Sequence, residues 1–341
     1  MSSNALKWLR LLASLVVLLV LGWVFRDELD FITDGLRRLR TADPVAVTVV
    51  IVASIAAIWA MGEVMRLLLA AGGLHISSKE TAALTLASNA WSTTLPAGPA
   101  FSAVLTFHVQ RTWGASVVLC GWFFVLSSAV STMWLVLIGI GGVLFLNADM
   151  AFWSLVATLA ATVAVAGVLF WMTNNPAKIE RWLRNLKMLK GDARERVMDQ
   201  VHSLYEVSLT PWQFSQIAFY SLANRLLDML SLWACLWAVT GTPPGFSAAP
   251  DHTSIAGVAL AYLTAKLAGS AQVTPAGLGT VEAAIIATLV ATGMTAVDAT
   301  GAAIIYRLIS FALITVIGWV IYFMHYARKG ITYAALNRKE A

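Results

Sequence analysis

The sequence predicts an all-α integral membrane protein: a polytopic helical bundle with two inverted repeats, each carrying a Pro/Gly-broken re-entrant helical hairpin. Of the 341 residues, 59% are apolar and only 12% are charged, against about 45–50% and about 25% in soluble domains. Long apolar stretches recur along the whole chain, and two of them are interrupted at their centre by similar Pro and Gly residues. A soluble enzyme and a disordered chain are both excluded, because neither tolerates so few charges among so many large apolar side chains.

Six apolar stretches approach the length of about 20 residues that a membrane-spanning helix requires. They cover residues 8–25, 45–65, 116–146, 150–173, 212–240 and 296–326. The first stretch begins with Lys7 and Arg10, but no small-residue cleavage site follows it. We therefore expect it to remain as a membrane anchor rather than to be removed as a signal peptide.

Two further apolar stretches, 80–110 and 254–293, are broken by the sequences Leu-Pro-Ala-Gly-Pro and Thr-Pro-Ala-Gly-Leu-Gly. An offset of 179 residues aligns the breaks without a gap, matching Pro96 with Pro275, Gly98 with Gly277, and Gly114 with Gly293. The agreement favours an internal repeat, with repeat one at about 45–146 and repeat two at about 212–326.

The placement of Lys and Arg predicts the orientation of the chain. If each broken stretch enters the membrane and returns on the same side, both termini share a side with sixteen of the 23 Lys and Arg residues. That side is expected to be the cytoplasm, and the membrane the plasma membrane. Three crossings separate the two breaks, so the repeats are inverted, a recurring design in transporters. The alternative, two kinked hairpins that span the bilayer, keeps the same orientation.

The two repeats are joined by a cytosolic linker at about 174–210, and the chain ends in a short basic tail at 327–341. Within the linker, Ile179, Trp182 and Leu186 recur at helical spacing with basic residues on the other faces. This pattern predicts an amphipathic helix on the inner leaflet, with a solvated helix as the alternative. We treat residues 1–341 as a single transmembrane domain.

Several functions are disfavoured by the sequence. The formal charge of +5 does not indicate nucleic-acid binding, because the basic residues lie in short blocks between apolar stretches. The sequence shows no catalytic or metal-binding motif, so we expect no enzyme activity, cofactor or metal. Cys120 and Cys235 lie inside apolar stretches, as packing residues do.

Charged residues inside the predicted spans point to a functional site, because such residues are costly in a bilayer. Five stand out: Arg225, Asp228, Lys266, Glu282 and Arg307. Arg225 and Asp228 are three residues apart on one predicted helix, so they can neutralise each other and be purely structural.

The second break predicts an anion site. Pro275 and Gly277 end one helix, and Gly279 and Thr280 begin another that carries Glu282 in its first turn. A helix that begins inside a membrane presents unpaired amides and a positive dipole end, which suit a phosphate. We expect Glu282 to steady those amides or to pair with Lys266 or Arg307, and a pairing leaves one base for a lipid phosphate. The alternative is a closed salt-bridge network that only locks the hairpin.

These arguments give two sets of candidate residues. The lipid headgroup is expected to contact Lys266, Gly277, Gly279, Thr280, Glu282, Arg307 and Arg225. The structural breaks are Pro96, Gly98 and Pro275.

The same residues resemble a known family, the lysylphosphatidylglycerol synthase transmembrane region. Its members carry a Pro-Gly-Gly-x-Gly-x-x-Glu run and a later Tyr-Arg, and the corresponding positions here are Pro275, Ala276, Gly277, Gly279, Glu282, Tyr306 and Arg307, with alanine in place of the first glycine. The first break departs from the family, because the run from Pro99 to Ala103 replaces the usual Gly-Glu and the nearby Arg. The first hairpin therefore lacks the charges expected there.

The resemblance implies a flippase-like protein that binds an anionic lipid, either a phospholipid or a polyprenyl-linked glycolipid, and moves it between leaflets. It also leaves an alternative: a membrane component of glycolipid or cell-envelope synthesis that presents a polyprenyl phosphate to a glycosyltransferase. The partners expected are anionic membrane lipids, a glycosyltransferase or other envelope enzyme, and a second copy of the chain. The chain ends at Ala341, so we expect it to lack the cytosolic aminoacyl-transfer domain of fused family members.

Overall fold

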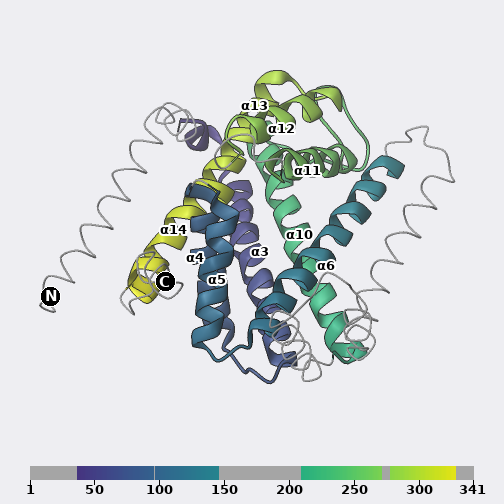
Figure 1. The fold of residues 1–341 in the computed structure, drawn as a ribbon. Helices are drawn as coiled ribbons and strands as arrows, with labels where there is room; N and C mark the ends of the chain where they lie inside the picture. The colour runs from purple at the N-terminus through teal and green to yellow at the C-terminus, as the bar shows by residue number, and fades with distance from the viewer. Residues whose placement is uncertain (1–36, 96, 146–208, 271–276, 328–341) are drawn as a thin grey trace, which may run out of the picture.

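A computed structural model of the chain describes residues 37–95, 97–145, 209–270 and 277–327 (Figure 1). Helices dominate this part of the chain, and no strand occurs in it beyond one isolated bridge between Ala249 and His252. The residues that the structure does not describe include the predicted crossings at 8–25 and 150–173, the linker from 174 to 208, the basic tail beyond 327, Pro96 and Pro275.

Four helices in the described ranges are long and apolar enough to cross a membrane. They are α3 (Pro44–Ala71), α6 (Val117–Phe145), α10 (Pro211–Thr240) and the last helix, which runs from Ala296 to Ala327. The last helix consists of α13 (Ala296–Tyr306), η4 (Arg307–Leu313), α14 (Ile314–Ile321) and η5 (Tyr322–Ala327). Together they confirm an all-helical membrane protein.

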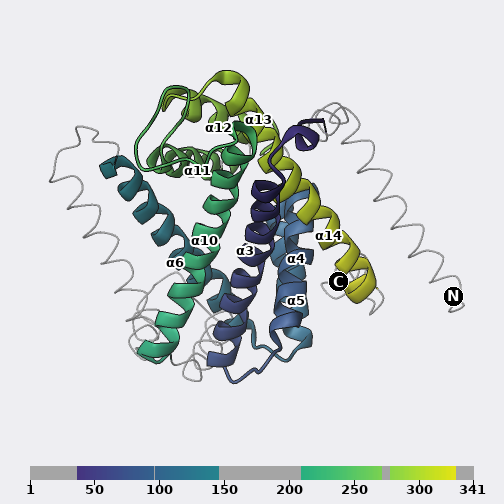
Figure 2. The same cartoon turned by 180° about the vertical axis from the view of Figure 1, so that it is seen from behind.

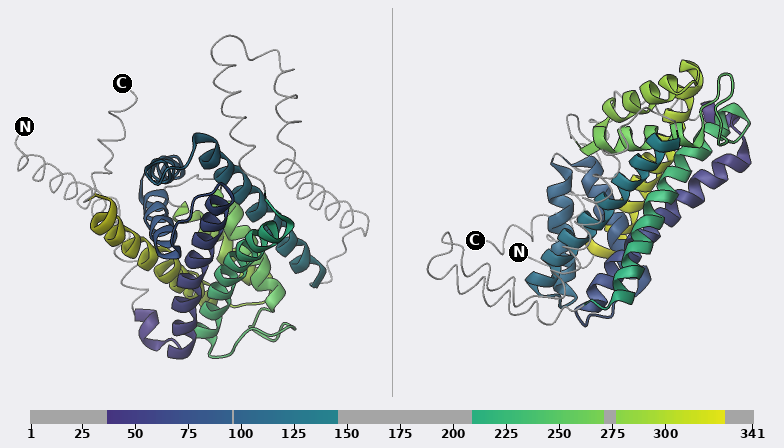
Figure 3. Two further views of the ribbon diagram at one scale, coloured as in Figure 1. Left: turned by 90° about the horizontal axis from the view of Figure 1, so that it is seen from below. Right: turned by 90° about the vertical axis from the view of Figure 1, so that its right-hand side faces the viewer.

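α3 and α10 pack side by side, as both views in Figure 3 show. Each begins with proline at its first position behind a polar cap: Asp43 accepts from the amides of Val45 and Ala46, and Thr210 forms a capping box with Gln213. The Asp43 amide also donates to the Ala238 carbonyl at 3.1 Å, so the start of α3 is tied to the end of α10.

α4 (Ser78–Thr94) and α5 (Gly98–Thr112) form the first hairpin. Their junction includes Ala97, whose φ of 53° lies in the left-handed region. Gly98 follows, and a Cβ there would collide with the Ser92 carbonyl oxygen, so only glycine fits this close approach. Farther down the hairpin, the hydroxyls of Ser88 and Thr106 hydrogen-bond across the two helices.

α11 (Ile255–Ser270) and α12 (Thr280–Ala291) form the second hairpin. Gly277 and Gly279 adopt φ of 66° and 77° just before α12, which is the backbone conformation that glycine adopts most readily. A hydroxyl pair again links the two helices, between Thr264 and Thr288 at 2.9 Å.

The hairpins connect to the long helices at opposite ends of the molecule. In Figures 1 and 2, the loops at 72–77 and 113–116 lie at the bottom, and those at 241–254 and 292–295 lie at the top. The first hairpin packs through α4 against α14, and the second packs through α11 against α6. The buried apolar residues accordingly form two clusters, one around α4, α5 and α6 and one around α10 to α13.

Candidate functional site

A cavity of about 410 Å³ lies where α3, α4, α10, α11, α12 and the last helix meet. Four of these elements supply its most polar side chains: Asn89, Thr93, Asn224, Asp228, Lys266 and Arg307. The cavity is therefore lined by both charged and neutral polar groups, although apolar helices surround it.

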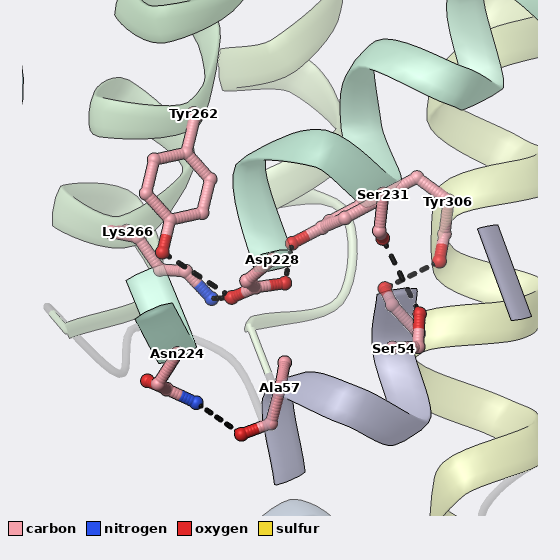
Figure 4. Close-up of polar contacts among 9 residues, drawn as sticks. Ser54, Ala57, Asn224, Asp228, Ser231, Tyr262, Lys266 and Tyr306 are labelled. Atoms are coloured by element: carbon pink, nitrogen blue, oxygen red, sulfur yellow. Dashed lines mark hydrogen bonds and ion pairs between the residues drawn. The ribbon is translucent and has the colours of Figure 1, made fainter. Parts of the chain in front are cut away.

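Asp228 accepts hydrogen bonds from three side chains on two other helices (Figure 4). The Lys266 ammonium lies 2.5 Å from Oδ2. The Tyr306 hydroxyl donates to Oδ1 at 2.9 Å, and the Tyr262 hydroxyl donates to Oδ2 at 3.3 Å. One carboxylate thus ties α10 to α11 and to α13, and it keeps the Lys266 charge balanced inside the membrane.

Arg225 does not neutralise Asp228 directly, although the two residues are one turn apart on α10. The ion pair of Asp228 is formed with Lys266 on α11. The Arg225 Nε is buried and has no hydrogen-bond partner among the described residues.

Arg307 forms the second ion pair of the site. Its Nε lies 2.6 Å from Oε1 of Glu282, and its guanidinium carbon lies 4.1 Å from the centre of the Phe311 ring. The Arg307 side chain is 7% exposed, so this pair is screened little by solvent. Of the pairings expected from the sequence, the structure has Glu282 with Arg307. The expectation that this leaves one base unpaired is wrong for Lys266, because Lys266 pairs with Asp228.

A wide π-helical turn, η4, carries Arg307 to the cavity. Arg307, Ser310 and Phe311 all line the cavity from this turn. Such turns are rare in proteins as a whole, but many of those that occur lie at functional sites. They shift side chains away from the ordinary α-helical register.

The structure separates the candidate headgroup residues into two groups. Lys266 and Arg307 line the cavity, together with Gly269 and Val281, which the sequence did not single out. The others lie outside the lining: Arg225, Gly277, Gly279, Thr280 and Glu282.

The start of α12 has the form that the sequence predicts. Gly279 stands at the N-cap and supplies no capping side chain, and the Thr280 hydroxyl donates to the Gly277 carbonyl at 3.1 Å. Glu282 occupies the first turn, where a negative charge is favourable. The second oxygen of Glu282 is buried without a hydrogen-bond partner in the described part of the chain.

Sequence reasoning missed the neutral polar residues of the cavity. Asn89 and Thr93 from α4, Ser54 from α3 and Asn224 from α10 all line it. Asn224 donates to the Ala57 carbonyl at 2.8 Å, and Thr93 shares a 3.1 Å hydroxyl pair with Thr315. The available signal was an asparagine inside an apolar stretch, since such residues in membrane helices usually face other helices rather than lipid.

These features define a polytopic helical membrane protein with a polar, charged cavity between its helices. The chain belongs to the lysylphosphatidylglycerol synthase TM region family, whose sequence profile matches residues 10–318. This finding confirms the resemblance that the second break suggests. A comparison with curated proteins found no match.

Proposed function

We propose that the protein is flippase-like: it binds an anionic lipid headgroup in the cavity and moves the lipid between leaflets. The observation that carries the proposal is the presence of Lys266 and Arg307 in a cavity between membrane helices. The family to which the chain belongs agrees with a role in handling lipids.

The ion pairs supply a chemical route for capturing a headgroup. A phosphate accepts charge-assisted hydrogen bonds from ammonium and guanidinium groups as a carboxylate does. A lipid phosphate can therefore replace Asp228 at Lys266 without leaving that ammonium unpaired in the membrane. The carboxylates keep the two cations in place while the cavity is empty.

The transport path that we propose depends on two inverted repeats with re-entrant hairpins. It is supported by matching features at the 179-residue offset: α6 begins at Val117 and the last helix at Ala296. The preceding turns match as well, because Gly114 and Gly293 have φ of 95° and 103°.

Helix packing supports the same relation. Gly139 on α6 packs closely against Leu263 of the second hairpin, and Gly318, 179 residues later, packs closely against Leu86 of the first. Hairpins that enter from opposite faces would meet near the midplane, where transporters of this design bind their substrates. Both termini would then lie in the cytoplasm, and we propose the plasma membrane as the location.

The proposal is tested by lipid transfer in reconstituted vesicles. We expect Lys266→Gln and Arg307→Gln to reduce transfer of fluorescent phosphatidylglycerol to the rate of protein-free vesicles, because each removes a cation that would hold the phosphate. Lys79→Gln serves as the control, since Lys79 is an exposed residue at the base of the first hairpin. This variant should transfer lipid at the rate of the unmodified protein.

Size-exclusion profiles and thermal unfolding of each variant show whether loss of transfer reflects loss of the fold. Folded variants at Lys266 and Arg307 that transfer lipid at the unmodified rate would contradict the proposal. That outcome would favour a protein that presents a polyprenyl phosphate to a glycosyltransferase.

A further inference from the structure

We infer that water binds inside the first hairpin, in a polar seam between α4 and α5 that leads to the cavity. This water site does not depend on the proposed function, because it concerns the packing of the hairpin itself. Three observations carry it: a buried amide without partners, two facing rows of polar residues, and the apolar side chains at the same positions of the second hairpin.

The first observation is the side chain of Gln110, which lies near the end of α5 with an exposed fraction of 0%. Neither Nε2 nor Oε1 of its amide has a hydrogen-bond partner among the described residues. The backbone carbonyl of Gln110 is occupied, because it accepts from the amides of Trp113 and Ala115. A buried amide without partners is costly between membrane helices, where no bulk water compensates it.

The chemistry of this amide selects the ligand. Its N–H groups donate and its carbonyl accepts, so it matches a ligand that does both. Water is the smallest such ligand, and buried waters in proteins bind at polar groups of this kind. Gln110 is fully buried and is not among the residues that line the cavity, so a lipid headgroup does not reach it.

The second observation is that Gln110 ends a row of polar residues. The row on α5 has four-residue spacing, which places its members on one face: Ser102, Thr106 and Gln110. A second row follows one face of α4: Thr81, Thr85 and Ser88. The hydrogen bond between Ser88 and Thr106 holds the two rows against each other.

The spacing of the rows suits bridging water. Successive groups are one helical turn apart, which is about 5.4 Å along the axis. A single water spans about this distance, because each of its two hydrogen bonds is about 2.8 Å long. Ser88 is followed by Asn89, which lines the cavity. The seam therefore leads from the loop end of the hairpin to the cavity in steps that water can bridge.

The third observation is that the second hairpin closes the same seam with apolar side chains. At the 179-residue offset, the row on α5 corresponds to three buried residues of α12: Val281, Ile285 and Leu289. Thr264 and Thr288 form a hydroxyl pair there and also donate to carbonyls of their own helices, so this pair needs no water.

The comparison isolates Gln110 as the unexplained residue. Hydroxyl pairs between membrane helices are a common form of packing, and they account for Ser88 and Thr106 as they do for Thr264 and Thr288. They do not account for Gln110, because the hairpin fold accepts leucine at the corresponding position. Bound water supplies the reason for an amide there.

X-ray hydroxyl-radical footprinting tests the seam, because radiolysis of a bound water oxidises the side chains beside it. Leu105, next to Thr106 on α5, and Leu289 on α12 are both 0% exposed, so bulk water reaches neither. In the unmodified protein we expect Leu105 to be oxidised severalfold faster than Leu289. Equal rates would overturn the inference, and neither rate depends on whether a lipid is transferred.

Gln110→Leu tests the residue that holds the water. It gives the first hairpin the side chain that the second has at position 289, so oxidation of Leu105 should fall to the rate of Leu289. Gln216→Leu, at a partly buried position of α10, is the matched control and should leave oxidation of Leu105 unchanged.

Size-exclusion profiles and thermal unfolding show whether each variant is folded. Thr106→Val is the second variant, since valine keeps the shape of threonine and removes the hydroxyl, and it should lower oxidation of Leu105 as well. Folded variants at Gln110 and Thr106 in which Leu105 is oxidised at the unmodified rate would overturn the inference.

Discussion

Arg307 shows what a cation requires when it lies between membrane helices. Glu282 supplies a carboxylate at 2.6 Å, and Phe311 covers the guanidinium face at 4.1 Å. A planar guanidinium makes both contacts at once, through an edge to the carboxylate and a face to the ring. The side chain is thereby held in one orientation beside the cavity.

Substitutions of Arg307 and Glu282 should have non-additive effects on the free energy of unfolding. Arg307→Gln leaves the Glu282 carboxylate buried without its partner, so we expect the free energy of unfolding to fall by about 3–5 kcal/mol. Arg307→Gln with Glu282→Gln should cost clearly less than the sum of the two single variants, because neither charge is left alone. Unfolding in mixed detergent micelles measures all three, and additive losses would contradict the pairing.

At the scale of the element, helix junctions depend on close backbone approach. The turn between α4 and α5 passes through Ala97 at φ 53° and then through Gly98, which lies against the Ser92 carbonyl. A side chain cannot be added here without moving one of the two helices. Since α4 supplies Asn89 and Thr93 to the cavity, the turn also fixes their position.

Gly98→Ala should therefore destabilise the protein by about 1–3 kcal/mol, because the new methyl group overlaps the Ser92 carbonyl oxygen. Gly121→Ala is the matched control, since an added Cβ at Gly121, within α6, meets no atom within 4 Å. That substitution should leave stability equal or raise it by about 0.5–1 kcal/mol. Thermal melts of both variants decide the matter, and equal melting temperatures would argue against the close approach.

The first residue of a helix could be predicted well from the sequence, including where an apolar stretch begins at a proline behind a polar N-cap. The stretches expected at 45–65 and 212–240 correspond to α3 and α10, which begin at Pro44 and Pro211. The stretch expected at 116–146 corresponds to α6, and the one at 296–326 to the last helix. In each case the start agrees within one residue, because composition and capping chemistry are both local properties.

Other features could not be predicted from local sequence. The Lys266–Asp228 pair joins residues on different helices, and only the packing of α11 against α10 brings them together. The π-helical turn at Arg307–Leu313 has no sequence signature comparable to a Pro cap. Local spacing favoured Arg225 as the partner of Asp228, and the tertiary structure favoured Lys266 instead.

At the scale of the whole molecule, each of the two hairpins packs against a helix from the other half of the chain. The hairpin of each half packs on the long helix that follows the other hairpin, α4 on α14 and α11 on α6. Neither half of the described chain therefore forms its packing alone. The cavity lies between them and takes residues from both, including Asn89 and Lys266.

The inverted arrangement that we propose predicts opposite accessibility of two loops. In a protein with Cys120 and Cys235 replaced by Ala, Lys79→Cys should react with a membrane-impermeant thiol reagent only from the cytoplasmic side. Phe246→Cys, at a position 87% exposed in the loop after α10, should react only from the outside. Labelling of intact cells and of inverted vesicles measures both, and reaction of the two cysteines from one side would contradict the arrangement.

Asp228 has a kinetic consequence as well as a structural one. It lies 2.5 Å from the Lys266 ammonium, so under the proposed function a departing headgroup would face a competing anion that is fixed beside the same cation. Affinity among related complexes is set mainly by how long the complex lasts, and a tethered competitor shortens that time. Under the proposed function, the Asp228 carboxylate would therefore shorten the time for which a lipid occupies the cavity and would favour turnover.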